Sequence, residues 1–343
     1  MISVGLIGGS GYTGKKIIQF CNNHPNINNF KIYGSSSAGK NILDIFPELQ
    51  NEIDNSEIIS ADTISFEHDV YFLALPHGEA LKYVPELIQK GKKVIDIGGD
   101  FRLANGEIYE KWYKIKHTAP ELLNQKVYGL ADDPTTYYTD AKLIANPGCY
   151  PTAALLALIP FVKNYNDEII SVSVSAYSGT SGAGKSPKTH LLMSEMDSNV
   201  AAYNLNEHRH EPEILQTLEK NGFDSPFAFV THLLPAAVGI YSTSFIHTKS
   251  KLDKNEIENV YNQFYANSSF IRMRTSPPQL NWVVNTNYCD IHISVKGNKV
   301  IIISAIDNLI KGASGQAIQN LNKIYGWKEY LGIKEGSSYE SVF

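Results

Sequence analysis

VGLIGGSGYTG, residues 4–14, is the stretch that decides the fold, because it joins a short apolar run to three glycines spaced three apart. Residues 15–20 then continue at helical spacing, so the order predicts a strand, a glycine turn and a helix. Such a turn lets the backbone approach a pyrophosphate at the N-terminus of the helix. An ordinary tight turn is the alternative interpretation. The residues predicted to bind a dinucleotide here are Gly8, Ser10, Gly11, Tyr12, Thr13 and Gly14.

The rest of the first half continues the alternation of strand and helix. Apolar runs occur at residues 30–33, 70–75 and 94–97, and residues 79–90 have the pattern of an amphipathic helix. Parallel neighbours in a sheet need crossover helices between them. We therefore predict an α/β Rossmann domain with a parallel sheet.

The strand-like runs beyond residue 150 are longer, and some alternate with period two, which favours antiparallel pairing. They are residues 169–176, 232–234, 239–246, 290–295 and 300–306, with a hairpin signal at 296–299 and a helical pattern at 313–325. We predict that residues 1–148, completed by a C-terminal helix at 312–343, form the Rossmann domain. Residues 149–311 are predicted to form an α+β domain with a mainly antiparallel sheet.

Composition narrows the classes of function. The chain has 343 residues, with 30 Lys and Arg against 35 Asp and Glu, and no basic stretch suited to nucleic-acid phosphates, so we expect no nucleic-acid partner. Its three cysteines lack C-x-x-C spacing, so we expect neither a disulfide framework nor a metal site. No apolar stretch approaches the ~20 residues that span a bilayer, and no signal-peptide pattern opens the sequence. These patterns predict a soluble, cytoplasmic protein with no membrane partner.

Serines follow the second predicted strand, where an acidic residue would bind the ribose 2′-hydroxyl of NAD. Ser35, Ser36 and Ser37 stand there, with Lys40 close behind. Hydroxyls and a cation suit a 2′-phosphate instead, so the sequence favours NADP over NAD. The alternative is that these serines only form a loop.

The segment GTSGAGKS, residues 179–186, satisfies the P-loop pattern and follows a predicted strand. The proline that follows is unusual at the start of a P-loop helix, and no apolar run ending in a magnesium-binding Asp lies downstream. We therefore favour a loop that binds substrate or phosphate over a nucleotide-hydrolysing site. A surface turn remains the third interpretation.

Cys149 lies in Asn146-Pro147-Gly148-Cys149-Tyr150-Pro151, directly before an apolar helical run at residues 153–159. Pro151 suits a first helical turn, which places Cys149 at or just before the helix N-terminus. The helix dipole favours thiolate over thiol there, and main-chain N–H groups can bind an oxyanion. We predict that Cys149 is a nucleophile, whereas Cys21 and Cys289 fit buried, unreactive positions.

A nucleophilic thiolate needs a partner for proton transfer, and the densest candidate segment is Glu207-His208-Arg209-His210-Glu211. His208 and His210 are two residues apart, so in extended backbone they share one face and Arg209 lies opposite. A solvated run of charges is the alternative interpretation.

These residues together resemble the aspartate-semialdehyde dehydrogenase-like family, and in particular its arginine-biosynthetic members. The resemblance runs nearly end to end. It rests on residues 8–14, LALPHG at 73–78, residues 94–103 ending in DFRL, YGL at 128–130, NPGCYP at 146–151, residues 178–185, HRHEPEI at 208–214 and IDNLIKGASGQ at 306–316. Two departures from the family pattern are Lys185, where Arg is usual, and Ala131-Asp132, where Pro-Glu is usual.

The resemblance implies NADPH-dependent, reversible reduction of an acyl phosphate to a semialdehyde through a cysteine thioester, in a homo-oligomer (a dimer or tetramer) whose second domain carries catalysis and subunit contacts. It implies that Cys149 is the nucleophile and His210 the general acid/base, with the order of His210 and His208 left open. The residues expected to bind substrate are His208, Arg209, Arg102, Lys185 and Ser181. Those expected to complete the cofactor site are Ser35, Ser36, Pro76, Asn308 and Gly312.

Three alternatives stay open at this point. One is a related reductase acting on aspartyl phosphate or on a longer or carrier-linked acyl phosphate, because one methylene changes affinity by only ~1–3 kcal/mol. The second is a nucleotide triphosphatase built on residues 179–186. The third is an NADP-sensing module in which Cys149 is unreactive.

Overall fold

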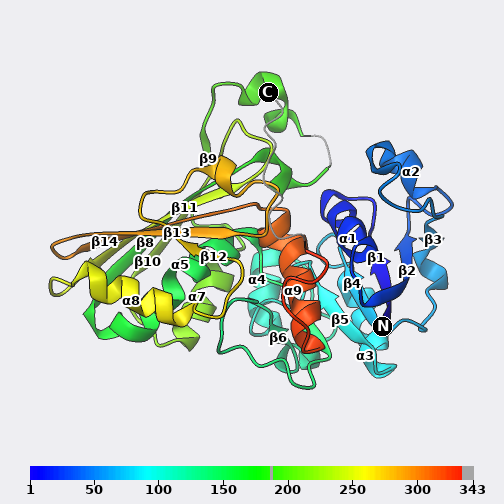
Figure 1. Ribbon diagram of the computed structural model, residues 1–343, viewed down its shortest axis with the longest axis horizontal. Coiled ribbons are helices and arrows are strands. Elements are labelled where there is room, and N and C mark those ends of the chain that lie inside the picture. Colours follow the sequence, from blue (N-terminus) through cyan, green and yellow to red (C-terminus); the bar gives the residue numbers. More distant parts are fainter. Residues whose placement is uncertain (186–187, 334–343) are drawn as a thin grey trace. The chain divides into compact units, whose positions relative to one another are not determined.

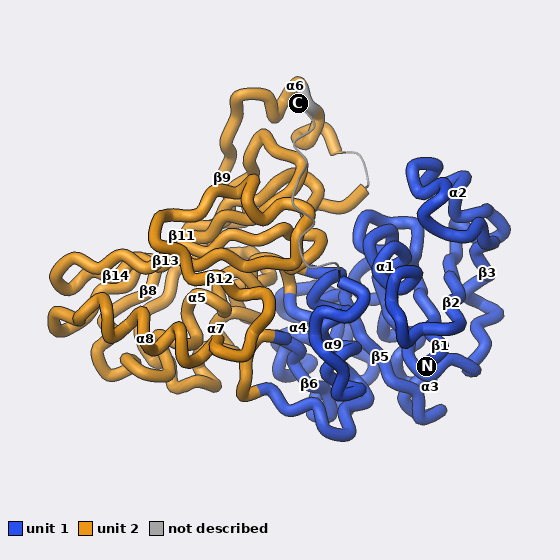
Figure 2. Tube along the Cα trace, viewed as in Figure 1, with its two compact units in different colours: residues 1–131, 136–147, 313–343 blue, residues 132–135, 148–312 orange. Residues whose placement is uncertain are grey.

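The computed structural model describes residues 1–185 and 188–333. These residues form two compact units, distinguished by colour in Figure 2. Unit 1 comprises residues 1–131, 136–147 and the described residues from 313 onward, and unit 2 comprises residues 132–135 and 148–312. The last residues of the expected helix at 312–343, and Ser186 of the P-loop-like segment, lie outside the described residues.

Unit 1 is built on a parallel sheet of seven strands in the order β3-β2-β1-β4-β5-β7-β6 (Figure 1). Its strands are β1 Ile2–Ile7, β2 Ile27–Gly34, β3 Ile59–Ser60, β4 Val70–Leu73, β5 Lys93–Asp96, β6 Val127–Tyr128 and β7 Leu143–Ala145. The predicted parallel sheet is confirmed, because every neighbouring pair in this sheet runs parallel. Since β1 lies between β2 and β4, the chain order reverses at β1. In sheets of this type, ligands bind at the carboxyl ends of the strands beside such a reversal.

Helices cover both faces of the unit 1 sheet, as parallel strands require. The helices of this unit are α1 Tyr12–Asn22, α2 Ile42–Ile45, α3 Val84–Gln89, α4 Gly106–Tyr113 and α9 Gly315–Ile324. On one face α1 contacts both β2 and α9. On the other, residues of α3 and α4 such as Leu87 and Tyr109 share a buried apolar cluster with Leu73 of β4 and Val94 of β5.

The prediction of a single helix over residues 79–90 is wrong. The segment forms a 3₁₀ turn at Ala80–Lys82 and then the short helix α3. Pro85 explains the break, because a proline has no N–H to continue a preceding helix but fits the first turn of a new one.

Unit 2 is built on a second seven-stranded sheet in the order β12-β13-β14-β11-β8-β10-β9. Its strands are β8 Ile169–Ser178, β9 Ala201–Tyr203, β10 Phe227–Leu233, β11 Ile240–Thr248, β12 Ile271–Met273, β13 Cys289–Lys296 and β14 Lys299–Ile306. The prediction of a mainly antiparallel sheet is confirmed; β8 pairs parallel with β10, and β12 with β13. The hairpin expected at residues 296–299 joins β13 to β14. Strand β10 is Phe227–Leu233 and so starts five residues earlier than predicted.

One face of this sheet packs on the helix α5, Cys149–Tyr165, which also contacts α7 Glu211–Lys220 and α8 Lys254–Phe264; the short helix α6 is Met193–Met196. Pro160 lies inside α5 and has no N–H for the carbonyl of Leu156, four residues earlier. The buried hydroxyl of Tyr265 donates to that carbonyl at 2.6 Å. Tertiary structure thus satisfies the group that proline leaves open, so the helix continues past it.

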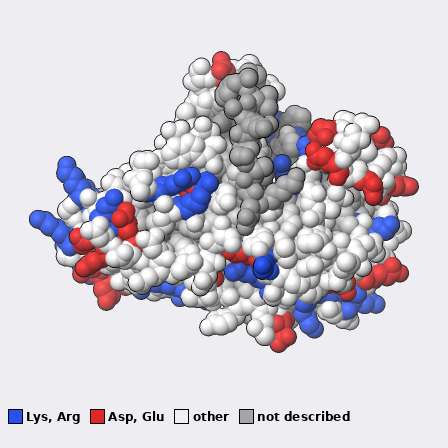
Figure 3. All heavy atoms as spheres, viewed as in Figure 1, with Lys and Arg blue, Asp and Glu red and all other residues white. Residues whose placement is uncertain are grey.

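Figure 3 shows Lys and Arg side chains intermixed with Asp and Glu on the described surface of the face drawn. No helix among the described residues is long and apolar enough to cross a membrane.

Candidate functional site

The glycine loop of unit 1 has the geometry of a phosphate-binding turn. Gly8 has φ +92°, and a Cβ added there would lie 2.4 Å from the carbonyl oxygen of Ala74. A Cβ on Gly14 would lie 2.6 Å from the oxygen of Gly9, whereas one on Gly11 would meet no atom within 4 Å. The backbone therefore turns at Gly8 and packs closely at Gly14, and it leaves open space at Gly11.

Gly11 is also the N-cap residue of α1, and no side chain caps the helix there. The first N–H groups of a helix attract anions, especially where no acidic residue stands in the first turn, as is true of α1. Ser10 and Thr13 are partly buried beside this end, and Tyr12 is exposed. These residues fit the pyrophosphate of a dinucleotide.

The remaining predicted cofactor residues of unit 1 follow the neighbouring strands. Ser35 and Ser36 are exposed directly after β2, whereas Ser37 is buried. Pro76 is exposed beyond the end of β4. Ser35, Ser36 and Pro76 lie at the carboxyl ends of strands that flank β1, which is where ligands bind in sheets of this type.

Arg102 also belongs to unit 1 and is buried. Its Nε donates to the carbonyl of Asn146 at 2.8 Å, and one terminal nitrogen donates to the carbonyl of Ile97 at 2.7 Å. Part of its hydrogen-bonding capacity therefore holds the main chain of this unit.

Cys149 is the first residue of α5, as predicted, and Gly148 is the N-cap residue. Its side chain is partly exposed, whereas Cys21 and Cys289 are buried. Burial raises the pKa of both buried thiols well above the ordinary value, so these two stay protonated. Among the three cysteines, Cys149 is the one that is partly exposed, and it lies at a helix N-terminus.

Glu213 supports the segment at residues 146–151 that leads into α5, here called the cysteine elbow, and the sequence did not predict this role. Its fully buried carboxylate accepts the main-chain N–H of Gly148 at 2.8 Å. Glu213 stands in the first turn of α7, three residues after His210. One side chain thus joins the start of α7 to the start of α5. The sequence signal that could have pointed to Glu213 is its place in the segment HRHEPEI, residues 208–214. Nothing in that segment, however, indicates a contact with Gly148.

The two predicted histidines lie together, with ring centroids 4.9 Å apart. The expectation of extended backbone is wrong at His210, which has helical φ and ψ as the N-cap residue of α7. The intervening Arg209 is exposed, as expected. A turn rather than a strand therefore brings the two rings to one side.

His208 is held as a neutral ring. Its Nδ1 accepts the main-chain N–H of His210 at 3.2 Å, which leaves Nε2 to carry the proton. Burial, aided by the positive charge of Arg209, lowers the pKa of His208 to about 4.

Tyr150, the residue after Cys149, lies at the centre of an aromatic cluster that sequence reasoning missed. Its ring contacts those of His208 and His210 at centroid distances of 5.3 and 5.9 Å. Its hydroxyl lies 2.9 Å from that of Tyr203. Burial raises the pKa of Tyr203 to about 12, so this hydroxyl stays protonated. The cluster fixes the histidine pair next to the cysteine elbow.

The P-loop-like segment does not form a P-loop over its described residues. Strand β8 leads into a 3₁₀ turn at Thr180–Ala183, and Gly184 follows with φ +85°. The next α-helix in the described chain is α6, so no helix starts at Lys185 as the phosphate-binding loop would require. Lys185 is exposed and Ser181 is partly buried.

Asn308 connects this loop to the turn after β14. Its amide donates to Ser181 Oγ at 3.0 Å and its Oδ1 accepts the N–H of Gly239 at 2.6 Å. Gly312, four residues on, lies against Cys149, because a Cβ built there would be 2.7 Å from Cys149 Cβ. Within unit 2, therefore, Gly312 lies against Cys149, the His208 and His210 rings pack on Tyr150, and Asn308 bonds to Ser181.

Comparison with known proteins agrees with both halves of this architecture. Residues 3–135 match the family model described as semialdehyde dehydrogenase, NAD binding domain. Residues 149–308 match the model described as semialdehyde dehydrogenase, dimerisation domain. Together these define an oxidoreductase with a nicotinamide-binding domain and a dimerisation domain.

Two relatives narrow the class, and both are named N-acetyl-gamma-glutamyl-phosphate reductase. The one from Shouchella clausii is 41% identical over 98% of this chain and 100% of its own length. The one from Pelotomaculum thermopropionicum is 40% identical over 97% of both chains. The chain belongs to the semialdehyde dehydrogenase family, among its N-acetyl-gamma-glutamyl-phosphate reductases.

Solved structures of more distant relatives share the fold. Aspartate semialdehyde dehydrogenase II from Vibrio cholerae superposes with a TM-score of 0.73 at 14% identity, covering 95% of this chain and 99% of that one. The enzyme from Candida albicans, solved with NADP, gives a TM-score of 0.65 at 15% identity, covering 95% of this chain and 98% of that one.

Proposed function

We propose that this protein reduces N-acetyl-gamma-glutamyl phosphate to N-acetyl-glutamate 5-semialdehyde in arginine biosynthesis, through a thioester on Cys149. The observation that carries the proposal is the partly exposed Cys149 at the first position of α5. The name shared by relatives about 40% identical over nearly the whole chain supports the substrate.

The first half-reaction uses the cysteine elbow. The Cys149 sulfur attacks the acyl carbon, a C–S bond forms, and the bond to phosphate breaks with the electron pair leaving on phosphate. Main-chain N–H groups at the start of α5 stabilise the oxyanion that develops. Lys185, Arg209 and Arg102 are the cations that we assign to the phosphate and carboxylate groups of the substrate.

The second half-reaction releases the aldehyde. NADPH, when bound, would supply the hydride that reduces the thioester carbon. The C–S bond then breaks, and the aldehyde leaves while the electron pair stays on the Cys149 sulfur as thiolate. We assign to His210 the transfer of the proton that the Cys149 thiol loses and regains, and we assign to His208 the role of orienting the substrate. The low pKa of His208 and its accepted hydrogen bond from His210 support this order, because a ring held neutral serves poorly as a proton carrier near neutral pH.

We propose NADP rather than NAD as the cofactor. The exposed hydroxyls of Ser35 and Ser36, directly after β2, support this choice because they suit a 2′-phosphate. In the same proposal Gly8, Ser10, Gly11, Tyr12, Thr13, Gly14, Pro76, Asn308 and Gly312 complete the cofactor site. The match to a dimerisation domain suggests a homo-oligomer, which we propose is a dimer or tetramer working in the cytoplasm.

A substrate panel tests the proposal in the reverse direction. Purified protein, NADP and phosphate are mixed in turn with N-acetyl-glutamate 5-semialdehyde, aspartate semialdehyde and the acetylated semialdehyde one carbon longer, and NADPH absorbance is followed. We expect the highest kcat/KM with the first substrate, by about tenfold or more over the one-methylene homologue. A higher kcat/KM with either other aldehyde would contradict the assignment.

A further inference from the structure

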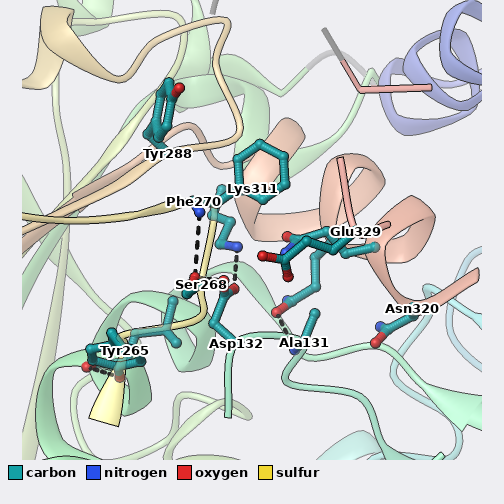
Figure 4. Close-up of polar contacts among 12 residues, drawn as sticks. Ala131, Asp132, Tyr265, Ser268, Phe270, Tyr288, Lys311, Asn320 and Glu329 are labelled. Carbon is teal, nitrogen blue, oxygen red and sulfur yellow. Dashed lines mark hydrogen bonds and ion pairs between the residues drawn. The ribbon is translucent and has the colours of Figure 1, made fainter. Parts of the chain in front are cut away.

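Unit 2 buries an ion pair that the mechanism above does not use. Lys311 Nζ bonds to Asp132 Oδ2, and neither side chain has exposed surface. Figure 4 shows the Lys311 ammonium pointing at the Asp132 carboxylate, with Ser268 beside it. Ser268 Oγ donates to the same carboxylate, and the ring of Phe270 lies 5.4 Å from Nζ. The two charged residues are 179 positions apart in the sequence.

Stability alone does not explain this pair. Removing two charges from water costs free energy that their mutual attraction often fails to repay, so a buried apolar pair of similar volume is commonly at least as stable. A buried pair does fix the relative positions of the two chain segments that carry it, because each charge has its partner in only one arrangement of those segments. The place of Lys311 in the chain shows which arrangement is held.

Lys311 belongs to a single turn of π-helix, Ile310–Ser314, that precedes α9. One end of this turn is tied to Asp307, whose Oδ1 accepts the N–H groups of Leu309 and Ile310 at 2.8 and 2.9 Å. The N–H of Gly312 returns to the Asp307 carbonyl at 2.9 Å. The Lys311 side chain anchors the middle of the same turn to Asp132.

Gly312, the residue that follows Lys311, packs against Cys149. A Cβ added to Gly312 would lie 2.7 Å from Cys149 Cβ and 3.1 Å from its Cα. A small shift of the turn would therefore change the space around the sulfur, either toward a clash or toward a gap. π-Turns within helices occur often at functional sites, where they place one residue out of helical register.

We propose that Asp132 and Lys311 are positioning residues that hold Gly312 against Cys149. They thereby determine how much space an acyl group has on the Cys149 sulfur. The proposal rests on the proposed role of Cys149. Neither residue touches substrate; they act through the turn that they anchor. Residues 132–135 belong to unit 2, although the residues on both sides of them belong to unit 1. This short segment places Asp132 next to Lys311.

The test uses the full-length protein and two variants. Asp132→Asn with Lys311→Met removes both charges together, so neither is left buried alone. Lys311→Arg keeps the charge but changes the length and shape of the side chain. Lys254→Met with Glu258→Gln, which removes an exposed pair on α8, is the matched control. Each protein is assayed for kcat, for KM of NADP, for thermal unfolding, and for the rate at which iodoacetamide alkylates Cys149, followed by peptide mass spectrometry.

We expect both Lys311 variants to unfold cooperatively, with kcat lower by about tenfold to a hundredfold and KM for NADP unchanged, because a small misplacement near reacting atoms has effects of this size. Alkylation of Cys149 should be several-fold faster, since Gly312 no longer packs against it. The control should match wild type in every readout. A wild-type kcat or a wild-type alkylation rate in a folded Lys311 variant would overturn the proposal, and Lys311→Arg decides the matter if the double variant does not fold.

The alkylation rate separates this proposal from the catalytic one. It reports packing at Cys149 whether or not the thiol is the nucleophile. Activity that survives Cys149→Ser would refute the thioester mechanism, whereas unchanged alkylation in the Lys311 variants would refute the positioning role.

Discussion

His208 and His210 are neighbours with different chemical environments. His208 lies among the rings of Tyr150, Tyr203 and Phe229, and its Nδ1 is occupied by a main-chain N–H. His210 stands at the N-cap of α7, next to the cysteine elbow that Glu213 holds. Their roles could not be ordered from the sequence, because the features that distinguish His208, its Nδ1 hydrogen bond and its lowered pKa, arise from the folded structure around it.

The low pKa of His208 gives a stability prediction. Its pKa of about 4 in the folded protein lies below the ordinary 6.5, so between these values the unfolded chain binds a proton that the folded chain does not. The free energy of unfolding should therefore fall as pH drops from 6.5 to 4, by about 3 kcal/mol from this residue. We expect urea titrations across that range to show a shallower pH dependence for His208→Gln than for wild type. Equal slopes would contradict the assignment of a buried neutral ring.

At the scale of elements, the link between α5 and α7 depends on one carboxylate. Glu213→Ala should leave the Gly148 N–H without its acceptor and cost about 1–3 kcal/mol in the free energy of unfolding. It should also lower kcat, since the elbow is no longer tied to the helix that begins after His210. Glu213→Gln keeps an oxygen that can accept this N–H and serves as the control. Chemical denaturation and steady-state kinetics on both variants make the comparison, and an Ala variant as stable and active as the Gln variant would count against the link.

Elements set by local pattern were predictable, and those set by distant contacts were not. The glycine turn and the cysteine elbow were predicted because glycine, proline and apolar spacing act within a few residues. The break at Pro85 was missed because the apolar spacing of residues 79–90 continues across it. The contact of Glu213 with Gly148 and the pairing of Lys311 with Asp132 join segments far apart in the chain, where single-sequence patterns carry no information.

At the scale of the whole molecule, residues 149–308 match a dimerisation domain, and we expect the protein to assemble with copies of itself. Light scattering coupled to size-exclusion chromatography should give a molar mass of two or four times the 38.1 kDa of one chain. The mass should not change over a tenfold dilution near micromolar concentration, as expected for a large interface. A mass of one chain at every concentration would contradict the prediction.

The proposed chemistry depends on Cys149, the first residue of α5. The most direct test follows NADPH absorbance with N-acetyl-glutamate 5-semialdehyde, NADP and phosphate, for wild type and Cys149→Ser, with a control that lacks phosphate. We predict phosphate-dependent reduction of NADP by wild type and a loss of about a thousandfold or more in the variant, while NADPH still binds to both proteins as measured by fluorescence. Turnover by Cys149→Ser at a rate near that of wild type would contradict the thioester mechanism.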